Sequence, residues 1–85
     1  MDIMELMDFA ENAISRALKK KYRDNRFIDD VAWGETRFRL PIYEIGSSPM
    51  DCHGVTAFSF CVDEDSDDVK KDLKEALDYF IRYQL

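Results

Sequence analysis

The segment Val55–Val62 constrains the fold more than any other part of the chain. It contains no glycine, proline or formally charged residue, and it is rich in β-branched and aromatic side chains. With the two-residue alternation of a strand, one face carries the bulkier side chains, Thr56, Phe58, Phe60 and Val62. The other face is mostly small. This pattern predicts a sheet strand whose bulky face is covered by helices.

An amphipathic helix is predicted from Asp67 to Tyr83, with Ser66 as its N-cap and acidic residues in its first turn. Its apolar stripe consists of Val69, Leu73, Ala76, Leu77, Phe80 and Tyr83. The N-terminal segment has a second helical stripe, made of Ile3, Leu6, Met7, Ala10, Ala13, Ile14, Ala17 and Leu18. Asp24-Asn25 is expected to end this first helix.

The segment from Phe27 to Ile45 is typical of a hairpin. Gly34-Glu35 fits a two-residue turn, which would place Trp33 opposite Thr36 and Phe27 opposite Ile42. Because Asp29 would then face Leu40, and because Pro41 lacks a backbone donor, we expect a bulge or an edge position there. The segment 46–54, bounded by glycines and containing a proline, is predicted to be a long loop.

These elements predict one small α+β domain over residues 1–85, with the order helix–three antiparallel strands–helix (αβββα). Both helices are expected on one face of the sheet, because both apolar stripes need covering. That covered face would consist of Val31, Trp33, Phe38, Leu40, Phe58 and Phe60. The opposite face would expose Arg37, Arg39, Ser59 and Ala57, bordered by Tyr43 and Ile45.

The net charge of −6 is unevenly spread along the 85 residues. Residues 16–26 carry +5, whereas residues 1–15 and 63–85 carry −4 each. Such an acidic domain repels nucleic acid at long range and favours a partner with a basic surface. No apolar run is long enough for a membrane span and no basic leader is present, so we expect no membrane partner and a cytoplasmic location with reduced thiols.

The candidate chemical groups do not form a recognisable catalytic set. Cys52 and His53 are adjacent, whereas thiolate–imidazole pairs normally come together from distant segments, and Cys61 does not complete a metal-binding spacing. We therefore expect no catalytic residue, no metal, no cofactor and no Cys52–Cys61 disulfide. The run 63–68 starts like a calcium loop, but Asp68 and Lys74 occupy the positions where that loop needs Gly and Glu. A solvated acidic turn and a carboxylate patch for a basic partner remain as interpretations.

The predicted order of elements and several residues of the C-terminal half resemble those of a known family. Pro41-x-Tyr43, then His53, Phe58 and Val62, then Lys70-Lys71-x-x-Lys74, resemble the double-stranded-RNA-binding domain. The resemblance implies that the lysines at the start of the last helix grip phosphates. In this chain, however, Asp67 and Asp68 precede those lysines, the glycine-rich approach is missing, and an additional hairpin strand precedes Pro41.

The sequence favours a small, acidic, non-enzymatic protein that binds and inhibits or neutralises a partner protein. We expect a phage anti-defence (anti-CRISPR-type) inhibitor or an immunity-type protein that acts by mimicry of nucleic-acid charge. The predicted partner-binding residues are Asp63, Glu64, Asp65, Asp67, Asp68, Asp72, Glu75, Arg37 and Arg39, with the 46–54 loop as an alternative contact surface. A homodimer through the exposed sheet face or an edge strand stays open.

Two other functions also stay open at this stage. The first is a nucleic-acid-binding module that uses basic residues of the first helix and the hairpin, Lys19, Lys20, Lys21, Arg23, Arg37 and Arg39. The second is a small enzyme or metal protein centred on Cys52 and His53.

Overall fold

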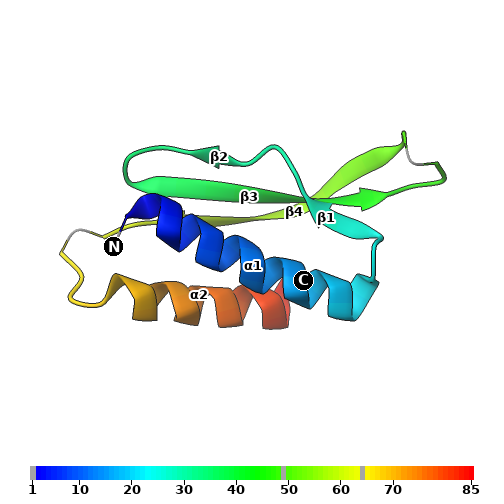
Figure 1. Ribbon diagram of the computed structural model, residues 1–85. Helices are drawn as coiled ribbons and strands as arrows, with labels where there is room; N and C mark the ends of the chain where they lie inside the picture. The colour runs from blue at the N-terminus through cyan, green and yellow to red at the C-terminus, as the bar shows by residue number, and fades with distance from the viewer. Residues whose placement is uncertain (1, 49, 64) are drawn as a thin grey trace.

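The protein has two layers, a four-stranded antiparallel sheet and a pair of helices, as seen in a computed structural model (Figure 1). The structure describes residues 2–48, 50–63 and 65–85. The elements follow in the order α1 (Ile3–Tyr22), β1 (Arg26–Ile28), β2 (Ala32–Trp33), β3 (Arg37–Ile45), β4 (Cys52–Cys61) and α2 (Val69–Tyr83). The predicted α+β class and the helix–strands–helix order are confirmed.

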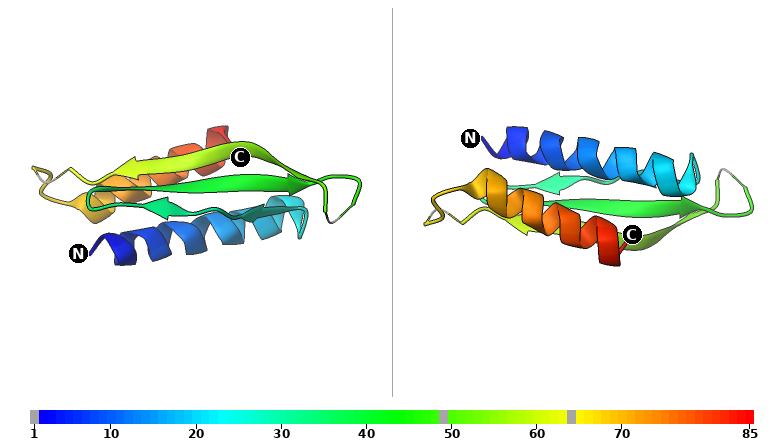
Figure 2. Two further views of the ribbon diagram at one scale, coloured as in Figure 1. Left: turned by 90° about the horizontal axis from the view of Figure 1, so that it is seen from above. Right: turned by 90° about the horizontal axis from the view of Figure 1, so that it is seen from below.

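Strand β3 is the centre of the sheet. β1 and β2 pair with it one after the other along one side, and β4 pairs with its other side. Both helices cover the same face of the sheet, as predicted, and they run in the same direction (Figures 1 and 2). The N-termini of the two helices therefore lie at one end of the molecule and their C-termini toward the other.

Helix α1 forms where the apolar stripe predicts it. The Asp2 side chain accepts a hydrogen bond of 3.2 Å from the Met4 backbone N–H at the N-terminus, and the helix ends at Arg23, whose φ is 57°. The buried residues of the helix all belong to the predicted stripe and are Leu6, Met7, Ala10, Ile14 and Leu18.

Helix α2 begins two residues later than predicted, at Val69. Asp68 is its N-cap, and the Asp68 carboxylate accepts a 3.1 Å hydrogen bond from the Lys71 backbone N–H. The predicted cap, Ser66, instead donates its hydroxyl to the carboxylate of Asp72. Three residues of the predicted stripe are buried, namely Leu73, Leu77 and Phe80, but Tyr83 is exposed.

The hairpin is present, but its predicted register is wrong. Trp33 lies opposite Phe38 rather than Thr36, because the turn is longer than two residues, and the Gly34 N–H donates to the Arg37 carbonyl. Phe27 lies opposite Tyr43 rather than Ile42, which moves it to the face without helices. The segment that links β1 to β2 has one residue more than the part of β3 that it faces. Within this segment Asp30 has a positive φ of 55°. The irregularity predicted near Asp29 and Pro41 is confirmed.

The hairpin of β3 and β4 is longer than predicted. β4 begins at Cys52, so His53 and Gly54 belong to the strand and the connecting loop spans only 46–51. Pro49 of that loop lies outside the described residues. The pairing shifts by one residue between Ile42 and Tyr43, where β4 carries an additional residue.

The core lies between the sheet and the two helices. Its sheet side consists of Phe38, Leu40, Ile42 and Phe58, and half-buried Val31 and Phe60 pack against it. Trp33 lies opposite Phe38, but it is 58% exposed at the end of a two-residue strand and is therefore not covered as predicted. The predicted exposure of Arg37, Arg39 and Ser59 on the opposite face is confirmed, and Ala57 is half-buried there.

The molecule is a long slab of 45 × 24 × 17 Å. Its radius of gyration is 13.4 Å, whereas a compact chain of this length is expected near about 12 Å. The elongation leaves two well-separated ends, and the charged residues are distributed unequally between them.

Candidate protein-binding surfaces

One end of the molecule, which we call the acidic end, is formed by the loop after β4 and the first turn of α2. Its described carboxylates are all exposed and are those of Asp63, Asp65, Asp67, Asp68 and Asp72. Glu75, also exposed, follows one turn later on α2. Glu64, which the sequence also assigned to this surface, lies outside the described residues.

The loop of the acidic end is held by its own side chains. The Asp65 N–H donates to the Asp63 carboxylate at 2.9 Å, and the Ser66 N–H donates to the Asp63 carbonyl at 3.1 Å. Together with the Asp68 cap, these bonds fix the path of the chain into the helix. The carboxylates of Asp63 and Asp68 are therefore held by backbone hydrogen bonds at this end.

The carboxylates of the acidic end form no close ion pairs within the described part of the chain. Over residues 2–48, 50–63 and 65–85, the ion pairs within 4.0 Å are Arg26–Glu44 and His53–Glu44, and neither involves this end. The nearby ammonium groups of Lys70 and Lys74 lie 5.4 and 5.9 Å from the centre of the Phe9 ring of α1. These two lysines thus reach across the helix pair toward Phe9, while Lys71 lies in the first turn of α2 and Arg37 begins β3 at the same end.

The parallel helices add further charge to the same end. Asp2, Glu5 and Asp8 occupy the first two turns of α1, whose N-terminus lies at the same end of the slab as the start of α2 (Figure 1). The basic residues of α1 follow in its second half and lie toward the opposite end. Sequence reasoning recorded both charge runs, but only the parallel packing of the helices shows that the two acidic runs share one end.

Arg37 and Arg39, the two basic residues of the predicted partner-binding set, do not belong to this surface. They lie on the outer face of β3, away from the helices, opposite Cys61 and Ser59 of β4. There they border a shallow depression that also involves Ala32, Trp33 and Ser59. Along β3 this face continues to the stacked rings of Phe27 and Tyr43, whose centres are 6.0 Å apart.

The residues proposed for nucleic-acid binding are divided between two ends of the slab. Lys19–Lys21 lie at the C-terminus of α1, whereas Arg37 begins β3 at the other end (Figure 1). The Lys21 ammonium donates at 2.9 Å to the carbonyl of Ile81, so it caps the last turn of α2. The structure therefore does not assemble these cations into one groove.

The Cys–His residues are not assembled into one site either. Cys52 and Cys61 are both exposed and free, and they begin and end the same ten-residue strand, which separates them by about 30 Å. No group of three or more His, Cys, Asp or Glu residues with the spacing of a metal site occurs in the described part of the chain.

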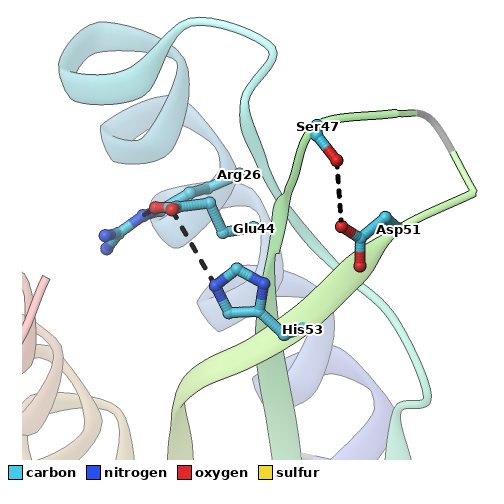
Figure 3. A network of polar contacts seen from close by, with 5 residues as sticks. All are labelled: Arg26, Glu44, Ser47, Asp51 and His53. Carbon is cyan, nitrogen blue, oxygen red and sulfur yellow. Dashed lines mark hydrogen bonds and ion pairs between the residues drawn. The ribbon is translucent and has the colours of Figure 1, made fainter.

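A polar network near the β3–β4 loop was missed by sequence reasoning. Glu44 accepts a 2.7 Å hydrogen bond from the Arg26 guanidinium and lies 4.0 Å from the His53 imidazole (Figure 3). Arg26 also stacks over the Tyr22 ring at 3.9 Å. The predicted two-residue turn placed Arg26 and Glu44 out of register, and the predicted loop removed His53 from the sheet, so no sequence pattern indicated this network.

No protein-family model, curated protein or solved structure matches this chain. Among the described residues, no helix is both long and apolar enough to cross a membrane. The assignment of function therefore depends on the surfaces alone.

Proposed function

We propose that this protein acts by binding another protein through its acidic end, and that it blocks a basic surface of that partner without carrying out chemistry. The observation that carries the proposal is the cluster of exposed carboxylates at the acidic end, none of which forms an ion pair within 4.0 Å among the described residues. A carboxylate surface that is held in shape by its own hydrogen bonds loses little conformational entropy on binding. It also attracts cationic partners over a longer range than neutral surfaces do.

The proposed class is an inhibitor or neutraliser of the anti-defence or immunity type, acting by mimicry of nucleic-acid charge. Asp63, Asp65 and Asp67 lie on one short turn, and the N-terminus of α2 starts beside them. A row of negative groups with this dense spacing fits a protein surface that ordinarily receives phosphates. The resemblance to the RNA-binding domain does not favour nucleic acid itself, because Asp67 and Asp68 directly precede the lysines that would grip phosphates.

The experiment that tests this function is capture from cell lysate with the immobilised protein, followed by identification of the retained proteins. Three forms are compared: wild type, D63N/D65N/D67N, and the control E11Q/D24N/D78N, which removes the same charge away from the acidic end. We expect wild type and control to retain the same basic protein, and the first variant to lose it. Duplex DNA added as a competitor should displace that protein.

Equal capture by all three forms would contradict the acidic end as the binding surface. The nucleic-acid alternative has its own readout, which is a titration of the protein with duplex RNA and DNA at two salt concentrations. Tight binding that weakens steeply with added salt would replace the proposal, since phosphate contacts release counterions.

A further inference from the structure

The outer edge of β4 is a long strand edge that lacks the usual protection against pairing. Its ten residues, Cys52–Cys61, include no Asp, Glu, Lys, Arg or Pro, and the one irregularity lies near its beginning. Strand edges of soluble proteins are ordinarily blocked by charges, prolines or a covering segment. The opposite edge has these features, because β1 and β2 are short and are separated by Asp29 and Asp30.

The hydrogen-bond pattern shows which backbone groups point outward from this edge. Val62 N–H donates to the Thr36 carbonyl at 2.6 Å, just beyond the end of the paired region. In an antiparallel ladder the direction alternates, so Phe60 and Phe58 bond to β3. The N–H and C=O groups of Ala57, Ser59 and Cys61 consequently point away from β3, toward solvent.

We propose that β4 pairs antiparallel with β4 of a second copy of this chain, about a twofold axis at Phe58. In this register Ala57 of each copy lies opposite Ser59 of the other, so the outward N–H and C=O groups of both residues are paired. Cys61 lies opposite Val55, where the irregularity of the strand ends the regular edge. The regular part of the edge is thus its own complement, as a closed isologous interface requires.

The side of α2 next to this edge carries two exposed tyrosines. Tyr79 and Tyr83 are 59% and 66% exposed, and the centres of their rings are 4.9 Å apart. Tyr79 and Ala76 border a shallow groove whose other wall includes Ala57 and Phe58 of β4. The twofold axis at Phe58 would bring the two copies of this groove together and bury the tyrosines, which are residues favoured in interfaces.

The charge distribution favours a second copy in the antiparallel orientation. The strand edge itself carries no formal charge, so pairing buries no carboxylate or ammonium group. The twofold axis places the acidic ends of the two copies on opposite sides of the axis, whereas a parallel arrangement would place them side by side. Because the other edge is interrupted, the assembly stops at two copies.

The first test is the mass of the full chain in solution, measured by light scattering or sedimentation from about 1 μM to about 1 mM, a range that covers weak and moderate association. We expect twice the chain mass of 10.0 kDa at the upper concentrations. Tyr79→Glu, which places two carboxylates near the axis, should raise the dimer dissociation constant about tenfold or more. Trp33→Glu is the matched control, since it changes an exposed aromatic residue beside the opposite edge, and it should leave the constant unchanged.

The second test is residue-resolved hydrogen exchange at high and low protein concentration. We expect the amides of Phe58 and Phe60 to be protected at both concentrations, and those of Ala57 and Ser59 to be protected only at the high one. Ser59→Pro removes an N–H that is unused within the chain, and it should abolish both this protection and the dimer. A wild-type protein that stays monomeric throughout, or a dimer that Trp33→Glu disrupts and Tyr79→Glu does not, would overturn the proposal.

Discussion

The two edges of the sheet are built in opposite ways around the same central strand. On one side, β1 and β2 contribute three and two residues and leave a gap between them. On the other side, β4 continues for ten residues. The comparison shows that protection of an edge is encoded locally, by a few residues that interrupt a strand, and that this chain protects only one of its edges.

Pro41 shows how the interrupted edge is matched to the central strand. Its carbonyl accepts a 3.2 Å hydrogen bond from the Asp29 N–H, at the gap between β1 and β2. The N–H that proline lacks would have pointed to this same gap, because both groups of a residue in an antiparallel pair face the same neighbour. The proline thus lies at a position of β3 where a missing donor removes no ladder bond.

The largest expected effect tests whether both edges depend on one core. Leu40 of β3 is fully buried between them. We expect Leu40→Ala to lower the free energy of unfolding by about 2–5 kcal/mol, because it leaves a cavity under both edges. Urea denaturation followed by circular dichroism measures the change, and the exposed neighbour Arg39→Ala is the control with an expected change within about 0.5 kcal/mol. A similarly small change in the free energy of unfolding for both variants would contradict the assignment of Leu40 to the core.

The second prediction compares the turns at the two ends of β3. An added Cβ at Gly46 would lie 2.8 Å from the Asp51 carbonyl oxygen, whereas one at Gly34 would have no atom within 4 Å. Gly46→Ala should therefore destabilise the protein by about 1–3 kcal/mol, and Gly34→Ala should change its stability by less than about 1 kcal/mol. Thermal melting of the two variants side by side checks this. Equal melting temperatures would show that the turn between β3 and β4 has room for a side chain at Gly46.

The third prediction concerns the residue that interrupts the protected edge. Asp30 has a φ of 55°, a conformation that β-branched residues avoid. Asp30→Val should be less stable than Asp30→Gly by about 1–2 kcal/mol. Both variants lose the hydrogen bond from the Tyr43 hydroxyl to Asp30, so their difference in urea midpoint isolates the backbone term. A valine variant as stable as the glycine variant would mean that the chain can pass from β1 to β2 without this conformation.

The smallest expected effect is a change in the pKa of Tyr43 beside the same edge. Its hydroxyl donates at 2.8 Å to Asp30, and this hydrogen bond, with burial and the negative charges of Asp30 and Asp29, raises the pKa of Tyr43 above the ordinary value of 10.0. Because the folded state holds this proton more tightly than the unfolded state, the contribution to stability is present below pH 10.0 and is lost as pH rises through the folded pKa.

Asp30→Asn should lower this pKa. Alkaline absorbance titration measures it, with Tyr43→Phe as the reference that removes one titrating phenol. An unchanged titration curve in the Asp30→Asn variant would show that the hydrogen bond does not hold the proton.

The parts of this fold that could be predicted from sequence are those determined by local periodicity. Leu73, Leu77 and Phe80 recur at helical spacing, and Phe58 and Phe60 alternate as in a strand, so burial followed from spacing alone. The register could not be predicted, because it depends on the conformation of Asp30 and on a turn longer than two residues. Those two features together moved Phe27 to the uncovered face and left Trp33 exposed.

The candidate surfaces were predictable in composition but not in arrangement. That Asp63, Asp65 and Asp67 would be exposed followed from their charge and their place before a helix. That Asp2 and Glu5 share their end of the molecule depends on the parallel packing of α1 and α2, which no local pattern determines. The Arg26–Glu44 pair was missed for a similar reason, since it exists only in the observed register.

Helices α1 and α2 lie side by side, although Phe9 and the Lys74 that reaches over its ring are separated by most of the chain. Most of the stability of a helix in a protein comes from packing of its apolar face, so α1 has little stability of its own until β3 and α2 are in place. During synthesis its apolar stripe is therefore uncovered until α2 has also left the ribosome. Folding is expected to be a late and cooperative event, and a chaperone that shields this stripe in the nascent chain would act before any native contact of α1 can form.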